Sequence, residues 1–78
     1  MNTSKKVKDI LKELSGSESI KEENNIISDL SLDSLQLITL LVEIESVFEI
    51  ELNESDMNPF ELNTVSDVIT LVNKYVGE

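Results

Sequence analysis

Apolar and polar residues follow one another with the period of an α-helix in three separate stretches of this chain. The stretches cover residues 3–15, 34–48 and 64–76, and in each the apolar side chains recur three and four positions apart. In a fourth, shorter stretch, 58–62, an asparagine precedes a proline, which is typical of the first turn of a helix. The pattern therefore predicts three main helices and one short third helix between the second and the last.

The helix predicted over residues 34–48 carries two apolar surfaces. At 100° per residue, one broad face is expected to lie in the core, and it comprises Leu37, Leu40, Leu41, Ile44, Val47 and Phe48. A second face points in a different direction and comprises Leu35, Ile38 and Val42. A surplus apolar patch with a polar rim is typical of a surface that contacts another protein. We expect such a contact here, and burial beneath a loop is the alternative.

The start of this helix is marked by its capping residues. Asp33 is a favoured N-cap, and Gln36 three positions later completes a capping-box pattern. Ser34 is then the first helical residue, close to unpaired backbone N–H groups and to the positive end of the helix dipole. A phosphate group would be stabilised at that position.

Two connections are expected to matter for the fold. A long loop, which follows Ser15-Gly16-Ser17 and runs to about residue 32, joins the first two helices, and loops of this length in small domains are often functional. Five aliphatic residues are expected to hold it against the bundle: Ile20, Ile26, Ile27, Leu30 and Leu32. Within residues 49–56, Ile50 and Leu52 alternate with acids, which predicts an extended connector with these two side chains turned inward.

Composition excludes several kinds of chemistry. The chain of 78 residues has no cysteine and no histidine, so it lacks the usual nucleophile, general base and metal ligands, and we predict neither an enzyme nor a metal site. Its net charge of −10 argues against nucleic acid and favours partners with basic surfaces, although acidic residues also simply keep a small protein in solution. No apolar stretch is long enough to span a membrane and no secretory signal begins the chain, so stable membrane insertion is not expected and a cytoplasmic location is.

Asp33, Ser34 and Leu35 at the start of such a helix resemble the attachment motif of acyl and peptidyl carrier proteins. The helix order and the long first loop extend this resemblance over essentially the whole chain. It implies one all-α domain, residues 1–78, folded as a small four-helix bundle of the acyl-carrier type. It also implies that Ser34 carries 4′-phosphopantetheine, taken from coenzyme A, and that partner enzymes contact a set of nearby residues: Asp33, Leu35, Ile38, Val42 and Glu45. Asp33 serving only as a helix cap is the alternative for that residue.

The resemblance also implies a function and a set of partners. The expected function is to carry acyl or aminoacyl groups as thioesters, as a monomer that meets a phosphopantetheinyl transferase, a loading ligase and downstream synthases or transferases. Serine at position 31 replaces a glycine that is frequent in the family, and Gln36, Thr39 and Ser46 stand where fatty-acid carriers usually have acids. These departures favour a polyketide, nonribosomal-peptide or other specialised pathway over fatty-acid synthesis. The competing hypothesis is an unmodified acidic helical adaptor that binds a basic protein.

Overall fold

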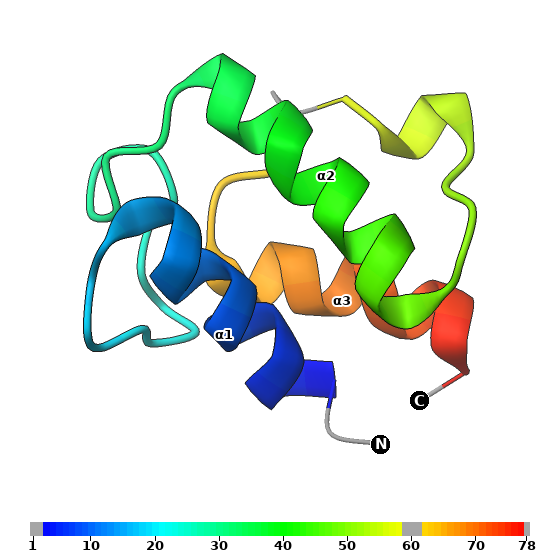
Figure 1. The fold of residues 1–78 in the computed structure, drawn as a ribbon, viewed down its shortest axis with the longest axis horizontal. Coiled ribbons are helices and arrows are strands. Elements are labelled where there is room, and N and C mark those ends of the chain that lie inside the picture. The colour runs from blue at the N-terminus through cyan, green and yellow to red at the C-terminus, as the bar shows by residue number, and fades with distance from the viewer. Residues whose placement is uncertain (1–2, 59–61, 78) are drawn as a thin grey trace.

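The structure, a computed structural model, describes residues 3–58 and 62–77. This part of the chain contains three α-helices, α1 (Thr3–Ser15), α2 (Ser34–Phe48) and α3 (Val65–Val76), and one turn of 3₁₀-helix, η1 (Glu54–Asp56) (Figure 1). The same residues form no β-strand, only an isolated antiparallel bridge between Asn25 and Thr64. The predicted all-α fold is confirmed.

The helices begin and end at residues whose chemistry favours a boundary. Thr64 is the N-cap of α3, where its side chain accepts a hydrogen bond from the Asp67 N–H, and Gly77 ends the helix in the left-handed conformation. The bounds of α1 and α2 are those expected from the sequence, and α3 begins one residue later than expected, at Val65. The short helix predicted over 58–62 falls mostly on residues 59–61, which lie outside the described residues.

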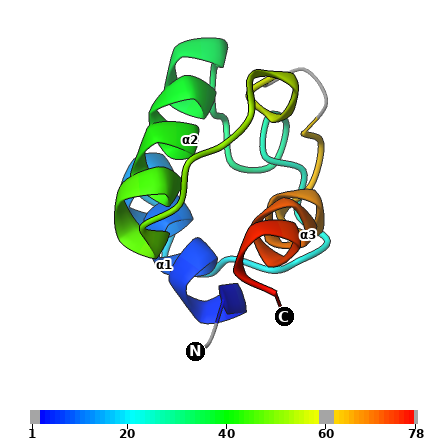
Figure 2. The same ribbon diagram turned by 90° about the vertical axis from the view of Figure 1, so that its right-hand side faces the viewer.

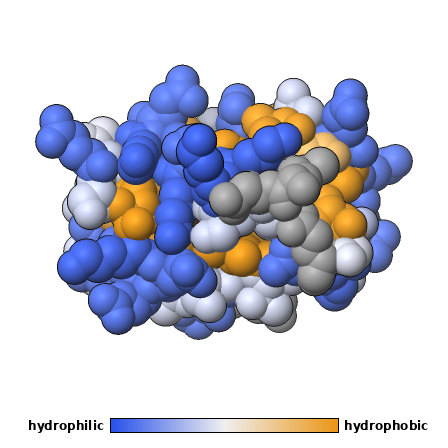
Figure 3. Space-filling model, turned by 90° about the horizontal axis from the view of Figure 1, so that it is seen from below, coloured by the Kyte–Doolittle hydropathy of each residue, from blue (hydrophilic) through white to orange (hydrophobic). Residues whose placement is uncertain are grey.

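The three helices enclose one hydrophobic core. Helix α1 packs against both α2 and α3, and Figure 2 shows α1 and α2 on one side, α3 on the other and the connection from α2 to α3 crossing between them. Buried side chains from all three helices and both connections form the core: Val7, Ile10, Leu11, Ile20, Ile26, Leu30, Leu32, Leu37, Leu40, Leu41, Ile44, Phe48, Leu52, Leu62, Val65, Val68, Ile69 and Val72. The surface on the side of α1 and α3 is mostly hydrophilic, with apolar residues exposed in separate patches (Figure 3).

The long loop between α1 and α2 is fastened to the start of α3. The Ile26 N–H donates to the Asn63 carbonyl at 2.9 Å, and the Val65 N–H donates to the Asn24 carbonyl at 3.0 Å. Four of the five aliphatic residues expected to hold the loop are buried, but the prediction for Ile27 was wrong, since its side chain is 50% exposed. The Asn25 side chain accepts hydrogen bonds from the N–H groups of Ile27 and Ser28, and the turn that it closes leaves Ile27 outside the core.

The connector after α2 is only partly extended. Leu52 is buried and Ile50 packs against the core, as predicted, but residues 54–56 form η1 instead of continuing the extended chain. The Asp56 carboxylate accepts hydrogen bonds from the Tyr75 hydroxyl and from Lys74 Nζ, the latter at 2.9 Å. The Tyr75 oxygen in turn accepts from the Asn53 N–H at 2.9 Å. These bonds hold η1 against the end of α3, and their partners lie too far along the chain for local pattern to reveal them.

Candidate functional site

The residues just before Asp33 position the chain that leads to Ser34. Leu30 and Leu32 are buried, and the Leu32 N–H donates to the Ile26 carbonyl at 3.1 Å. Between them, Ser31 adopts a left-handed conformation with φ of 58°. This turn, anchored by two leucines, brings the chain to the surface at Asp33.

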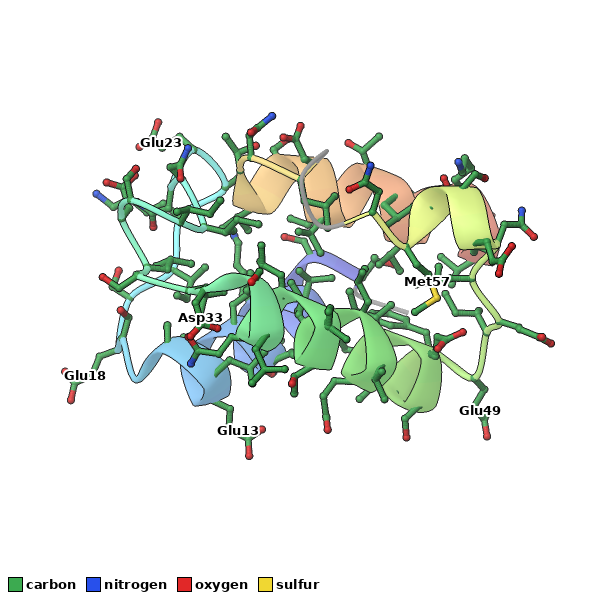
Figure 4. The ribbon with its side chains drawn as sticks, turned by 90° about the horizontal axis from the view of Figure 1, so that it is seen from above. Glu13, Glu18, Glu23, Asp33, Glu49 and Met57 are labelled. Carbon is green, nitrogen blue, oxygen red and sulfur yellow. The ribbon has the colours of Figure 1, made fainter. Side chains whose placement is uncertain are left out.

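A complete capping box begins α2, as predicted. Asp33 Oδ1 accepts from the Gln36 N–H at 2.8 Å, and Gln36 Oε1 accepts from the Asp33 N–H at 3.2 Å. Gln36 Nε2 also donates to the Leu14 carbonyl at 3.2 Å, which ties the start of α2 to the last turn of α1. Sequence reasoning missed this bond, because its partners are 22 positions apart and no local pattern marks them. Figure 4 shows Asp33 where α2 begins.

Ser34 is the first residue of α2, and its side chain is exposed. Among the described residues its hydroxyl has no hydrogen-bond partner, and the N–H groups of Ser34 and Leu35 have no acceptor. The first turn of α2 contains no acidic residue. A phosphate ester on the Ser34 oxygen would therefore meet two N–H donors and the positive end of the helix dipole, so these residues fit a phosphate-linked group.

The second apolar surface of α2 is exposed to solvent. Leu35 is 72% exposed, Ile38 46% and Val42 52%, so burial beneath the loop is excluded. We call these three residues the docking face. The prediction that Val47 lies in the core was wrong, since it is 40% exposed. It stands roughly 75° from the centre of the buried stripe, at the edge that faces α1.

The predicted site residues share one side of α2. At 100° per residue, the sector that contains them is about 100° wide, and it includes Ser34, Leu35, Ile38, Val42 and Glu45. Glu45 differs from the others because it is half-buried and its Oε2 accepts from the Leu52 N–H at 2.9 Å. The structure thus places Glu45 beside the connector and the rest of the set in the open.

The described part of the chain contains neither a metal-binding group of side chains nor a helix that could span a membrane. Residues 3–58 and 62–77 contain no group of three side chains from His, Cys, Asp and Glu that would hold a metal ion. None of the helices in these two ranges is both long and apolar enough to cross a membrane.

The fold and the site together define a class of protein. It is a small all-α domain that presents one serine hydroxyl at a helix N-terminus, next to an exposed apolar face. Such a site is suited to modification by another protein that docks on the helix.

Comparisons with known proteins identify the family. The family model described as "Phosphopantetheine attachment site" matches residues 5–72, and the chain belongs to this family. An acyl carrier protein of Thermotoga maritima is 34% identical over 74 residues, which cover 92% of this chain and 89% of that relative. One from Chlamydia muridarum is 41% identical over 61 residues, covering 78% and 71%. A solved structure of an acyl carrier protein from Thermotoga maritima superposes with a TM-score of 0.76 at 26% identity, covering 97% of this chain and 93% of that chain.

Family membership confirms three predictions made from the sequence. The resemblance to carrier proteins is correct, and the cofactor of the family is covalently attached 4′-phosphopantetheine. The chain is a carrier and not a catalyst, in agreement with its lack of histidine and cysteine. The thiol of carrier chemistry belongs to the attached arm, which explains how a chain without cysteine takes part in thioester chemistry.

Proposed function

We propose that this protein is an acyl carrier protein in which Ser34 bears the phosphopantetheine arm. The observation that carries the proposal is the exposed Ser34 hydroxyl, which lies at the start of α2 beside the docking face and has no partner among the described residues. When bound, the arm supplies a thiol that holds acyl groups as thioesters. The acyl carrier proteins among the relatives support acyl over aminoacyl cargo.

The residues of this chain position the hydroxyl but do not activate it. No described side chain is hydrogen-bonded to Ser34, so the base that removes its proton must come from the transferase. The Ser34 oxygen then attacks the phosphorus of coenzyme A to which pantetheine is linked, and the nucleotide portion leaves. The N–H groups of Ser34 and Leu35 would stabilise the phosphodiester that forms, through hydrogen bonds and the helix dipole.

The docking face provides the apolar part of partner recognition. Burial of exposed Leu35, Ile38 and Val42 against a partner would stabilise a complex by about 25 cal/mol for each Å² of apolar surface removed from water. Asp33 is exposed next to Ser34 and is proposed to contact partners as well as to cap α2, and Glu45 is proposed to contribute its remaining carboxylate oxygen. An attached cargo meets each docked enzyme at high effective concentration, which is the advantage of a carrier over free diffusion.

Further proposals concern the pathway and the setting. We propose that residues 1–78 form a single carrier domain that acts as a monomer in the cytoplasm, with a loading ligase and downstream synthases or transferases as partners. We propose that the protein acts in a specialised pathway and not in general fatty-acid synthesis. The support for this choice is that three positions of α2 are uncharged, Gln36, Thr39 and Ser46, so that the helix offers few charges to a basic partner.

Intact-protein mass spectrometry tests the attachment proposal. The chain is incubated with coenzyme A and a broad-specificity phosphopantetheinyl transferase, alongside Ser34→Ala and the matched control Ser46→Ala, which removes another exposed serine from the same helix. We expect the wild type and Ser46→Ala to gain one phosphopantetheinyl group and Ser34→Ala to gain none. An unmodified wild type that is folded, while a known carrier is modified in parallel, would favour the acidic adaptor.

A further inference from the structure

The side-chain amide of Gln36 is bonded at both of its ends. Its oxygen, Oε1, accepts from the Asp33 N–H at 3.2 Å and so belongs to the capping box of α2. Its nitrogen, Nε2, donates to the Leu14 carbonyl at 3.2 Å, which lies 22 positions earlier in the chain. One side chain therefore caps α2 and joins it to α1.

The bond to Leu14 supplies a donor that α1 lacks. The last four carbonyls of an α-helix have no partner within the helix, and in α1 they belong to residues 12–15. The Lys12 carbonyl accepts from the Gly16 N–H at 2.9 Å, and the Leu14 carbonyl accepts from Gln36. This second bond is partly shielded from water. It stabilises the end of α1 and the start of α2 together.

Gln36 holds the first turn of α2 from the side opposite Ser34. Two residues along an α-helix correspond to a rotation of about 200° and an advance of about 3 Å. The Ser34 side chain is exposed, whereas Gln36 is half-buried and bonded to α1. The turn is thus fixed from behind while its serine faces outward.

This pair of bonds needs a side chain that both donates and accepts. An amide does both, whereas an ionised carboxylate only accepts. A glutamate at position 36 would keep the capping box, where Glu and Gln are equally usual, but it would put an acceptor against the Leu14 carbonyl. Repulsion there would release the first turn of α2 from α1, and helix ends fray when nothing holds them. Ser34, the first residue of that turn, would then lose its fixed orientation.

We infer that Gln36 is a positioning residue for the modification of Ser34, because its amide holds the first turn of α2 against α1 and presents the serine hydroxyl in one orientation. The inference rests on the proposed function and adds to it a residue that acts without touching the reacting atoms. A displacement of about 1 Å in the reacting groups can slow a reaction about 100-fold. Loss of one bond loosens the turn without removing it, so we expect a smaller effect, a fall of about fivefold in the rate of transfer.

Single-turnover kinetics, with the transferase in excess over the carrier and coenzyme A saturating, test this inference. They separate the maximal rate of transfer from the transferase concentration that gives half of that rate. Gln36→Glu keeps the cap and removes the donor, and Gln36→Met removes both without adding a charge. Thr39→Glu is the matched control for charge, since Thr39 is exposed on α2 and its hydroxyl donates to the Leu35 carbonyl of the same helix. Circular dichroism checks that each variant is folded.

We expect both Gln36 variants to lower the maximal rate fivefold or more, with the half-saturating concentration raised less than twofold. The control Thr39→Glu should change the maximal rate less than twofold. The separation of the two constants is the informative readout, because a residue that only stabilises the fold affects neither constant in a variant that is folded.

Three results would overturn the inference, and each has a different meaning. A folded Gln36→Met with the wild-type maximal rate would mean that the amide does not position Ser34, whatever an added charge does in Gln36→Glu. A raised half-saturating concentration with an unchanged maximal rate would mean that Gln36 contacts the transferase directly. Absence of modification of the wild type would reject the proposed function itself, together with the inference that rests on it.

Discussion

At the scale of single residues, Ser34 is available because the hydrogen bonds of the capping box do not involve its hydroxyl. Asp33 Oδ1 is bonded to the Gln36 N–H, and the Gln36 side chain is bonded to both Asp33 and the Leu14 carbonyl. The hydroxyl of Ser34 has no such partner in the described part of the chain. The capping box thus fixes the helix start and leaves the serine oxygen accessible to a transferase.

Asp33 is proposed to have two roles, and two substitutions separate them. Asn is as good an N-cap as Asp, so Asp33→Asn should keep the free energy of unfolding within about 0.5 kcal/mol of the wild type, whereas Asp33→Ala should lower it by about 1 kcal/mol. Both variants lose the charge proposed to contact the transferase, so both should raise KM for the carrier several-fold. Urea unfolding and modification kinetics measure the two effects. Modification of Asp33→Asn at the wild-type rate would show that Asp33 is only a helix cap.

Residue-level chemistry allowed much of the site to be predicted from the sequence. Asp33 and Gln36 indicate a capping box, and the helical period separates Leu35, Ile38 and Val42 from the core. The left-handed conformation of Ser31 was not predicted, because serine is not a usual residue at φ of 58°. The one signal for it is the glycine that is frequent at this position in the family, since glycine adopts positive φ readily.

At the scale of elements, the spacing of apolar residues predicts where each helix lies, but it does not predict which segments pack against that helix. The edge of a buried stripe is set by how closely another helix packs, which is why Val47 was placed in the core by pattern and is 40% exposed in the structure. A small cavity between α1 and α2 depends on the same packing, and its lining residues, Ile10, Glu13, Leu14 and Glu43, come from positions about 30 residues apart in the chain. Neither feature has a local signal in the sequence.

Two carboxyl groups, Asp56 in η1 and Asp67 in α3, make the stability of the fold depend on pH. The hydrogen bond from Tyr75, followed by that from Lys74, lowers the pKa of the Asp56 carboxyl below its ordinary value. The pKa of the Asp67 carboxyl is also lowered, first by the N–H of Thr64 and then by that of Asn63. A carboxyl whose pKa is lower in the folded chain than in the unfolded chain favours folding when ionised. These contributions are complete above the ordinary pKa of about 4 and are lost as the pH falls through the folded values.

Substitution of Tyr75 tests the pH dependence of these bonds. Tyr75→Phe removes the hydroxyl that donates to Asp56, so the free energy of unfolding should fall at neutral pH. Its difference from the wild type should shrink on acidification to about pH 3, because the contribution of a carboxyl with a lowered pKa is being lost once the pH is below the ordinary value of about 4. Urea unfolding followed by circular dichroism at the two pH values measures both differences. As a control, Tyr75→Phe should have less effect in a chain that already carries Asp56→Asn. A difference that is the same at both pH values would mean that Tyr75 acts through packing alone.

At the scale of the whole molecule, charge is divided unequally along the chain. Four of the six lysines lie in α1, whereas residues 22–73 contain twelve acids and no basic residue. Such a field steers a partner with a basic surface toward the acidic elements, and closer contacts then fix its orientation. We propose that the docking face is where such contacts form.

The overall fold could be predicted because several separate features of the sequence indicate the same structure. Helical period, caps and the long first loop all indicate the same bundle, and the family match over residues 5–72 is in accord with them. The fastening of that loop to α3 was not predictable, since the bonds from Ile26 to Asn63 and from Val65 to Asn24 join segments about 40 residues apart. Such non-local bonds are determined by how the helices pack and not by any one stretch of sequence.

The most direct measurement of the central claim is the position of the attached group. After modification with coenzyme A and the transferase, fragment-ion mass spectrometry of the wild-type chain assigns the added mass to a residue. We predict a single phosphopantetheinyl group on Ser34. A group on Ser31, Ser46 or any other residue would contradict this claim, because the exposed serine at the start of α2 would then not be the site that partner enzymes use.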